Sequence, residues 1–354
     1  MESTINHRKI LVIQLRQLGD TLLATPLLRQ LRRLYPAASI DFLGQPSNRC
    51  IVEHNPAVAE ILVLPRRASA TQLFQVARNL RWRRYDLVVD CQSLTKTAFV
   101  TRWSGAEKRC GLDRGWPRNR VCYTHPLKLS GADYLQYCPR HKLNLLQDPR
   151  VDLNDLDLDF PISRDDAQIG AALFRKRLNA PTVVLYPVSS LPEKAWPPAR
   201  FIELGRRIAA KGLRLLVAFG PGQEQDAQVV AREIGKAAVA DYGVLSLAQM
   251  KGAFEHCIAF IGNDGGPKHV ATAAGLPTLT LFDQINPGAW TDARTARHRA
   301  VGTTRSHREG DSRWRITRAT KLAEITVDDV WEELSPLLDL ASAETAMQPG
   351  RLAA

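Results

Sequence analysis

Hydrophobic residues gather in short, nearly continuous runs, and apolar residues recur at helical spacing in the segments between them. Strands that are buried on both faces carry such continuous runs, so the pattern predicts parallel β-strands. The intervening segments predict amphipathic helices, as in "TPLLRQLRRLYP", where Leu27, Leu31 and Leu34 share one side and arginines the other. The runs are "KILVIQL" (9–15), "SIDFLG" (39–44), "EILVLP" (60–65), "DLVVDC" (86–91), "TVVLYP" (182–187), "LRLLVAFG" (213–220), "CIAFIGN" (257–263) and "TLTLF" (278–282).

Strands and helices alternate in two separate series, which predicts two α/β domains. The first series fades into "QDPRVDLNDLDLDFPISRDD" (147–166), which is acidic and weak in periodicity, and the second begins at Thr182. A chain of 354 residues is expected to form about two domains. We therefore predict Rossmann-like domains over residues 1–165 and 166–325.

The C-terminal segment predicts one more helix. In "ITVDDVWEELSPLL", Thr326 is placed to cap a helix, with Asp329 three residues further on as the reciprocal partner. We expect this helix over residues 326–340, with packing back on the N-terminal domain as an option. Residues 341–354 are expected to form a flexible tail.

Charge is distributed unequally between the two halves. Residues 1–150 contain 24 Lys and Arg against 11 Asp and Glu, and the remaining residues contain 24 against 25. A basic surface attracts nucleic acid, an anionic membrane or a phosphorylated substrate, although scattered solvated arginines produce the same count. No nucleic-acid motif accompanies the charge, and aromatic residues are not interleaved with it as a stacking surface requires.

The sequence shows neither a membrane-spanning segment nor a secretory signal, and this bears on the expected cellular compartment. No apolar run reaches the roughly 18 residues of a membrane-spanning helix, and the polar start "MESTINHRKI" does not resemble a secretory signal. The six cysteines show no C-x-x-C pairing and are expected to be reduced, buried thiols. We expect a cytoplasmic protein.

Ligands of open α/β sheets bind beyond the carboxyl ends of the strands, so the strand-to-helix turns are the candidate sites. In "VIQLRQLGDTLLATP", Asp20 stands where a helix starts, and a helix N-terminus favours its ionised form. Spacing alone favours a simple capping role for this residue. In "YPVSSLPEKAWPPARFIELG", Ser189, Ser190 and Lys194 make a plausible phosphate seat, although cap serines and a surface lysine explain the pattern equally well.

Two further turns carry glycines. In "LLVAFGPGQEQDAQVV", Glu224 could accept ribose hydroxyls or simply favour a helix N-terminus. In "FIGNDGGPKHVATAAGLPTLTLF", Gly265 and Gly266 permit close backbone approach, and the amides of a helix expected to begin around His269 could hold a diphosphate. His269 itself could simply be packed.

Taken together, the motifs "LGDTLLATP", "KAWP" and "GNDGGPKHVATAAGLPTLTLF" resemble the ADP-heptose:lipopolysaccharide heptosyltransferases of glycosyltransferase family 9. The resemblance covers roughly residues 9 to 335. It implies a GT-B fold, with two Rossmann-like parallel-sheet domains facing across a cleft. It also implies an inverting transfer of heptose from ADP-heptose to the lipopolysaccharide inner core, without a cofactor or divalent metal.

The resemblance assigns roles to individual residues. It makes Asp20 the general base, and a carboxylate is suited to deprotonating the incoming hydroxyl. Amides and a lysine are suited to stabilising the leaving diphosphate. The donor site implied by the family comprises Ser189, Ser190, Lys194, Glu224 (with Gln223 as an alternative), Asp264, Gly265, Gly266 and His269.

The chain departs from the family pattern at two positions. Gly265 replaces the Ser or Thr that many members carry after the motif aspartate, and Asp283 stands where a glycine is usual. An extra carboxylate beside a diphosphate is unfavourable unless it points away. These departures concern the identity of the donor rather than the fold.

The basic N-terminal half suits an anionic, lipid-anchored acceptor and a transient contact with the cytoplasmic face of the inner membrane. Arg66, Arg67 and Arg120 are the candidate acceptor contacts. A family member with another nucleotide sugar or acceptor remains an alternative, and so does a two-domain protein that binds a nucleotide sugar without chemistry. A dinucleotide oxidoreductase is disfavoured because the first turn reads "LRQLGD" and not G-x-G-x-x-G.

Overall fold

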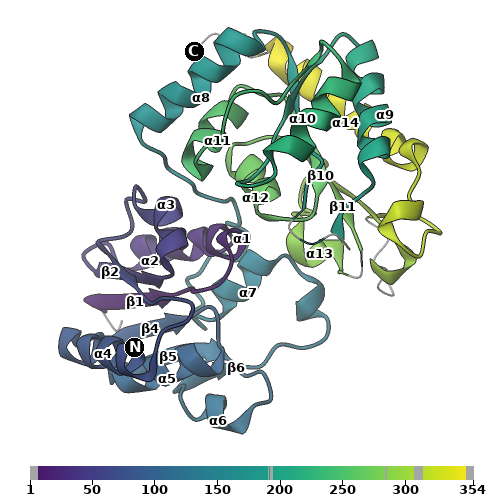
Figure 1. The fold of residues 1–354 in the computed structure, drawn as a ribbon. Helices are drawn as coiled ribbons and strands as arrows, with labels where there is room; N and C mark the ends of the chain where they lie inside the picture. The colour runs from purple at the N-terminus through teal and green to yellow at the C-terminus, as the bar shows by residue number, and fades with distance from the viewer. Residues whose placement is uncertain (1–6, 190, 192–193, 284, 307–313, 348–354) are drawn as a thin grey trace. The chain divides into compact units, whose positions relative to one another are not determined.

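The computed structural model divides the chain into two compact units, Met1–Pro161 and Ile162–Ala354 (Figure 1). It describes residues 7–189, 191, 194–283, 285–306 and 314–347. The division falls just before the boundary at residue 165 that the sequence suggested. Each unit contains its own parallel sheet, so the two series of strands form two separate α/β structures.

Unit 1 is built on a six-stranded parallel sheet in the order β3-β2-β1-β4-β5-β6. Helices α4 and α5 pack against each other, and α2 packs against α7. The strands are β1 (Lys9–Ile13), β2 (Ser39–Gly44), β3 (Glu60–Val63), β4 (Leu87–Asp90), β5 (Lys108–Leu112) and β6 (His125–Leu127). The helices are α1 (Leu18–Leu22), α2 (Thr25–Leu34), α3 (Arg49–Val52), α4 (Ala70–Arg83), α5 (Thr95–Ser104), α6 (Pro117–Arg120) and α7 (Cys138–Asn144), with 3₁₀ turns η1 (Pro46–Asn48) and η2 (Asp133–Leu135).

Unit 2 is built on a seven-stranded parallel sheet in the order β13-β12-β11-β10-β7-β8-β9. Its strands are β7 (Thr182–Tyr186), β8 (Arg214–Val217), β9 (Ala238–Val239), β10 (Ala259–Asn263), β11 (Thr278–Phe282), β12 (His298–Gly302) and β13 (Arg315–Ile316). Its helices are α8 (Arg164–Arg177), α9 (Pro198–Ala210), α10 (Glu224–Ile234), α11 (Leu247–Phe254), α12 (Gly266–Ala273), α13 (Pro287–Trp290) and α14 (Val327–Met347), with 3₁₀ turns η4 (Thr304–Ser306) and η5 (Leu322–Glu324).

Strand β1 shows why continuous apolar runs predicted the central strands. Leu11 and Ile13 lie in one core cluster with Leu80 of α4 and Val100 of α5. The intervening residues of the strand are fully buried as well, because helices cover both faces of the sheet. All eight predicted runs contain a strand of the structure.

The sequence prediction missed the outer strands. Strands β5, β6, β12 and β13 read "KRCGL", "HPL", "HRAVG" and "RI", and each includes partly buried or exposed residues. Strand β9 is only two residues long. Outer strands bury less of their surface than central ones, so the continuous apolar signal fades in them.

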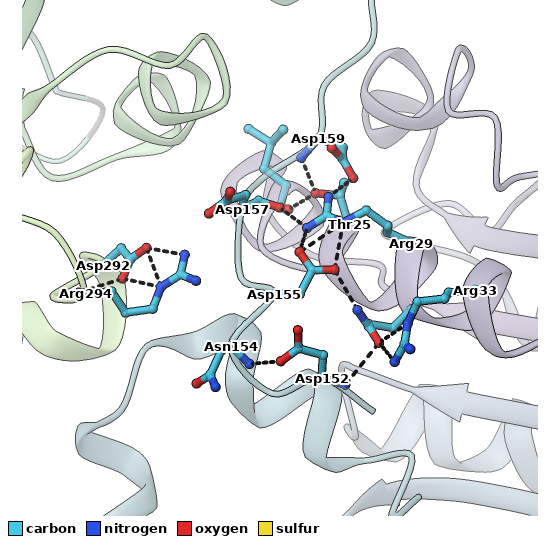
Figure 2. Close-up of polar contacts among 12 residues, drawn as sticks. Thr25, Arg29, Arg33, Asp152, Asn154, Asp155, Asp157, Asp159, Asp292 and Arg294 are labelled. Carbon is cyan, nitrogen blue, oxygen red and sulfur yellow. Dashed lines mark hydrogen bonds and ion pairs between the residues drawn. The ribbon is translucent and has the colours of Figure 1, made fainter. Parts of the chain in front are cut away.

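The acidic segment before the end of unit 1 is tied to α2, as Figure 2 shows. Arg29 of α2 donates from Nε to Asp155 Oδ2 at 3.0 Å and also pairs with Asp159. The backbone N–H of Asp159 donates to Thr25 Oγ1 at 2.8 Å. The acidic residues of this segment, where the sequence predicted the domain boundary, therefore hold it to α2 of unit 1.

Helix α14 packs on α9 and on strands β10, β11 and β12 of its own unit. The capping prediction is confirmed, because Thr326 N–H donates to Asp329 Oδ2 at 3.0 Å and Asp329 N–H donates to Thr326 Oγ1 at 3.1 Å. The helix extends past the predicted end at residue 340, to Met347.

Candidate functional site

The first candidate site lies at the carboxyl edge of the unit 1 sheet. Strand order reverses between β1 and β4, because β2 and β3 follow on one side of β1 and β4, β5 and β6 on the other. Such a reversal point is where open parallel sheets bind ligands. Asp20 follows β1 and is the third residue of α1, a helix whose N-cap is Gln17. Asp20 is therefore not the capping residue of its helix.

The Asp20 carboxyl is partly buried and lies beside two cations. Burial raises its pKa above the ordinary value, while Lys142 and Arg114 act in the opposite direction. The sequence expectation emphasised a helix N-terminus, but α1 has only five residues and burial is the larger influence. A carboxyl with a raised pKa has a stronger conjugate base, which suits proton abstraction.

Lys142 is a residue of this site that the sequence did not reveal. It is 5% exposed on α7, and its Nζ donates to Gln14 Oε1 at 2.8 Å. The pKa of Lys142 is raised although burial works against its charge, and Asp20 is among the groups that favour the ammonium. Because burial raises the pKa of the Cys91 and Cys138 thiols, that of Cys91 to about 12, the thiols are neutral near pH 7. Asp20 is then the anionic neighbour of this buried ammonium.

Gln14 connects Lys142 to the loop that carries Asp20. Its Nε2 donates to the carbonyl of Arg16 at 3.0 Å and to Gln92 Oε1 at 2.7 Å. Gln92 Oε1 also accepts from the backbone N–H of Arg16 at 2.8 Å. These bonds fix the path of the chain between β1 and α1, directly before Asp20.

The predicted acceptor arginines also follow strands of this sheet. Arg66 and Arg67 are exposed in the loop after β3, and Arg120 is exposed on α6 after β5. Arg120 Nε lies 3.5 Å from Asp113 Oδ2. Arg114, in the loop after β5, is the arginine that acts on the Asp20 carboxyl.

The second candidate site lies at the carboxyl edge of the unit 2 sheet. Strands β10, β7 and β8 are adjacent there, and each is followed by one of the predicted turns. Ser189 and Lys194 follow β7, Glu224 follows β8, and Asp264 follows β10. The parallel arrangement therefore brings three turns that are distant in sequence to one edge. Ser190 lies outside the described residues.

Asn263 holds two of these turns together. Its Oδ1 accepts from the backbone N–H of Trp196 at 2.9 Å, and its Nδ2 donates to the carbonyl of Val188 at 3.3 Å. Lys194 Nζ lies 3.9 Å from Asp264 Oδ2, with side chains 34% and 17% exposed. The arrangement leaves the Lys194 ammonium accessible while a carboxylate orients it.

Helix α12 begins beside this lysine and aspartate. It starts at Gly266, earlier than the expected start around His269, because Gly265 is the N-cap and Pro267 stands in the first turn. A Cβ at Gly266 would meet nothing within 4 Å, so its own packing does not demand a glycine there. The open space suits a ligand held against the helix N-terminus.

His269 and Lys268 are buried in the first turn of α12. Burial lowers the pKa of His269 well below its ordinary value, so its ring is neutral, and Nδ1 has no hydrogen-bond partner among the described residues. Burial lowers the pKa of Lys268 to about 8, although Asp264 acts against this. Lys268 Nζ donates to the carbonyl of Trp290 and lies 5.2 Å from the ring centre of Phe282. Lys268 is therefore a second cation of the unit 2 site, after Lys194, and the sequence analysis did not identify it.

The structure bears on the choice between Gln223 and Glu224. Gln223 Oε1 accepts from the backbone N–H of Gly220 at 3.1 Å and from Tyr186 Oη at 3.3 Å, so it supports the turn. Glu224 is the first residue of α10 and is partly buried. No described residue hydrogen-bonds its carboxylate. Glu224 is the better placed of the two to meet a ligand.

Asp283 and Ser189 have partners of their own. Thr303 Oγ1 donates to Asp283 Oδ1 at 2.9 Å, and Arg305 Nη1 lies 3.9 Å from Asp283 Oδ2. The departure from the family pattern at Asp283 is thus accommodated by residues at the end of β12. Ser189 Oγ accepts from the backbone N–H of Leu191 at 3.2 Å and stabilises the turn after β7.

Two Rossmann-like units, with polar turns at the carboxyl edge of each parallel sheet, give the chain a GT-B fold. Residues 73–317 match the sequence profile of Glycosyltransferase family 9 (heptosyltransferase), and the chain belongs to this family.

Relatives and solved structures agree with this membership. The chain is 29% identical over 295 residues to Lipopolysaccharide heptosyltransferase 1 of Pseudomonas aeruginosa, covering 79% of this chain and 80% of the relative. A family 9 glycosyltransferase of Veillonella parvula has the same fold, with a TM-score of 0.77, 21% identity and coverage of 96% and 99% of the two chains. An Escherichia coli heptosyltransferase solved with ADP gives a TM-score of 0.71, 18% identity and coverage of 93% and 99%. Among the residues that the structure describes, no helix combines the length and apolarity needed to cross a membrane.

Proposed function

We propose that this enzyme transfers a heptose from ADP-heptose to the inner core of lipopolysaccharide with inversion at the anomeric carbon. The observation that carries the proposal is the pair of hydrogen bonds from the Asn263 side chain to the backbone of Trp196 and Val188, which we call the Asn263 clamp. The clamp ties the turn that carries Lys194 to the end of β10, so that Lys194 lies beside Asp264 at the N-terminus of α12. A lysine and helix amides at one point suit a diphosphate. The heptosyltransferase relative of Pseudomonas aeruginosa supports the choice of sugar and acceptor.

The donor is assigned to unit 2, which we take as the nucleotide-sugar domain expected over residues 166–325. The diphosphate contacts Lys194 and the amides of Gly265 and Gly266, with Lys268 close behind them. Glu224 accepts hydrogen bonds from the ribose hydroxyls. Asp264, His269, Ser189 and Ser190 complete the site. No divalent metal is required, because the lysines and amides offset the charge of the leaving ADP.

The acceptor is assigned to unit 1, the domain expected over residues 1–165. Asp20 removes the proton from the acceptor hydroxyl, whose oxygen attacks the anomeric carbon. The bond from that carbon to the diphosphate oxygen breaks, ADP leaves with the bonding electron pair, and Asp20 keeps the proton until it passes to water. Lys142 does not touch the substrate and acts through Asp20. Its positive charge lowers the pKa of the Asp20 carboxyl, which burial raises, and so keeps more of the carboxyl ionised.

An anionic, lipid-anchored acceptor fits the basic surface of residues 1–150. Arg66 and Arg67 are exposed for contact with its phosphates or carboxylates, and Arg120 can exchange Asp113 for the same groups. This acceptor places the enzyme on the cytoplasmic face of the inner membrane as a peripheral protein.

The test is incubation of the purified protein with ADP-heptose and a set of truncated lipopolysaccharides, followed by mass spectrometry of the products. A mass increase of one heptose on a defined truncation, with release of ADP, is the expected result. Binding of ADP-heptose without any product would contradict the enzyme and favour a binding protein. Transfer from another nucleotide sugar alone would contradict the donor assignment.

A further inference from the structure

Exposed aromatic side chains are confined to unit 1 among the residues that the structure describes. Tryptophan and phenylalanine bury large apolar areas when they are covered, so a group of them at the surface indicates a partner. The exposed aromatic residues are Phe74 (49%), Trp82 (75%), Trp103 (47%), Trp116 (49%) and Tyr134 (46%).

Three of these side chains share one outer surface of α4 and α5. Phe74, Arg78 and Trp82 are four residues apart on α4 and therefore form one stripe. The opposite side of α4 carries Ala77 and Leu80, which are buried in unit 1. The Phe74 ring contacts Trp103 of α5 edge to face, with 5.7 Å between ring centroids. We call Phe74, Arg78, Trp82, Arg102 and Trp103 the α4–α5 aromatic face.

Every charged residue of α4 and α5 is a lysine or an arginine. Two of these cations have partners within unit 1. Arg83 forms ion pairs with Glu60 and Asp41, and Lys96 Nζ donates to the carbonyl of Pro65. Arg78, Arg81 and Arg102 are exposed. Asp86 and Glu107 line the depression beside Trp82, where Arg81 and Arg84 balance their charge.

We propose that the α4–α5 aromatic face docks on an anionic lipid bilayer. This inference rests on the proposed function, because a lipid-anchored acceptor brings the enzyme to such a surface. Tryptophan settles at the headgroup level of a bilayer, and arginines beside it meet anionic lipid. A protein partner fits less well, because the centres of protein interfaces are depleted in charged residues.

Sedimentation with vesicles of phosphatidylethanolamine and phosphatidylglycerol tests the proposal. The triple variant Phe74→Ser, Trp82→Ser, Trp103→Ser is expected to bind these vesicles at least tenfold more weakly than the wild type. Trp116→Ser removes an equally exposed aromatic residue elsewhere in unit 1 and is expected to bind like the wild type. Vesicles of phosphatidylcholine alone are expected to retain little protein.

The charge contribution is tested separately by Arg78→Glu with Arg102→Glu, which alters only exposed side chains and keeps the test valid if the triple variant does not fold. This double variant is expected to bind anionic vesicles more weakly than the wild type does. Its residual binding is expected to change little as the salt concentration rises. Unchanged binding by both variants, or an equal loss in Trp116→Ser, would overturn the proposal. So would a wild-type dimer in light scattering that the triple variant abolishes, because the face would then join two copies of the chain.

Failure of this inference can be distinguished from failure of the proposed function. With a water-soluble acceptor and no vesicles, the triple variant is expected to turn over like the wild type, because α4 and α5 contain none of the proposed catalytic residues. Loss of vesicle binding with intact turnover supports the docking face. Vesicle binding is measured without substrate, so it can be judged even if no heptose transfer is found.

Discussion

The side-chain oxygen of Asn263 accepts a hydrogen bond from the backbone N–H of Trp196 at 2.9 Å, across 67 residues of sequence. This bond joins the end of β10 to the turn that carries Lys194. Trp196 is fully buried, and its Nε1 donates to the carbonyl of Ile325 at 2.9 Å. The turn is thus fixed by two contacts at Trp196, one to Asn263 and one to Ile325. The position of Lys194 therefore depends on residues that are distant in sequence and not only on its own turn.

Asn263→Ala should therefore reduce both stability and donor affinity. Removing the amide leaves the Trp196 N–H buried without a partner, which costs about 1–3 kcal/mol. Thermal unfolding and calorimetric titration with ADP measure the two effects. Gln225→Ala, on the exposed surface of α10, is the control and should change neither. A stable variant with wild-type ADP affinity would show that the clamp does not organise the site.

Lys194→Ala should weaken ADP binding by about 1.5–3 kcal/mol, the range for a hydrogen bond to a charged group. The unfolding temperature should stay the same, because the Lys194 side chain is 34% exposed and its ammonium makes one ion pair, at 3.9 Å. Titration calorimetry gives the dissociation constant. Lys176→Ala, an exposed lysine of α8, controls for a general loss of charge. An unchanged dissociation constant in the Lys194 variant would remove this residue from the donor site.

Lys268 predicts a pH dependence of ADP binding. Its pKa in the free protein is lowered to about 8, and a bound diphosphate raises it by favouring the charged form. The affinity should therefore be constant below about pH 8 and fall above it, by at most tenfold per pH unit. Lys268→Met should bind ADP more weakly at pH 7 and should lose the decline above pH 8. Lys194→Met is the control, because it should keep that decline, and an identical decline in Lys268→Met would contradict the assignment.

The central strands and the polar turns after them could be predicted because both depend on local sequence. Continuous apolar runs report burial on two faces, and Asp20, Lys194 and Asp264 stand directly after such runs. Lys142 and Asn263 could not be found in this way. Lys142 meets Gln14 across 128 residues, and Asn263 meets Trp196 across 67, so their roles depend on contacts that only the fold creates.

Lys142→Met should move the acidic limb of the activity profile to higher pH. The ammonium lowers the pKa of Asp20 against the effect of burial, so its removal leaves more of the carboxyl protonated at a given pH. Turnover at low pH should fall several-fold, while the plateau at high pH should be kept. Measuring kcat/KM from pH 5 to 9 shows the shift, which a purely structural role of Lys142 would not produce. Lys128→Met, an exposed lysine of the same unit, should leave the profile in place.

Asp20→Asn separates an enzyme from a binding protein. Asparagine keeps the shape of the side chain but cannot accept the proton, so turnover should fall by roughly 10²–10⁴-fold, the usual contribution of a positioned general base. The unfolding temperature should fall somewhat, because the buried Lys142 ammonium loses its anionic neighbour, but the loss of a helix cap is not involved, since Gln17 and not Asp20 occupies the N-cap position of α1. ADP-heptose affinity should also be kept, because the proposed donor residues belong to unit 2.

Rate, affinity and unfolding temperature are measured together on this variant, with Asp152→Asn as an exposed control in the same unit. Burial raises the pKa of Asp20, so wild-type turnover should decline as the pH falls through that pKa and the carboxylate is protonated. The Asn variant should lack this decline, because its residual rate does not depend on a titrating base. Near-wild-type turnover would refute the catalytic role. A parallel loss of ADP-heptose affinity would instead make Asp20 a donor contact, because a general base that acts only on the acceptor hydroxyl has no reason to change donor binding.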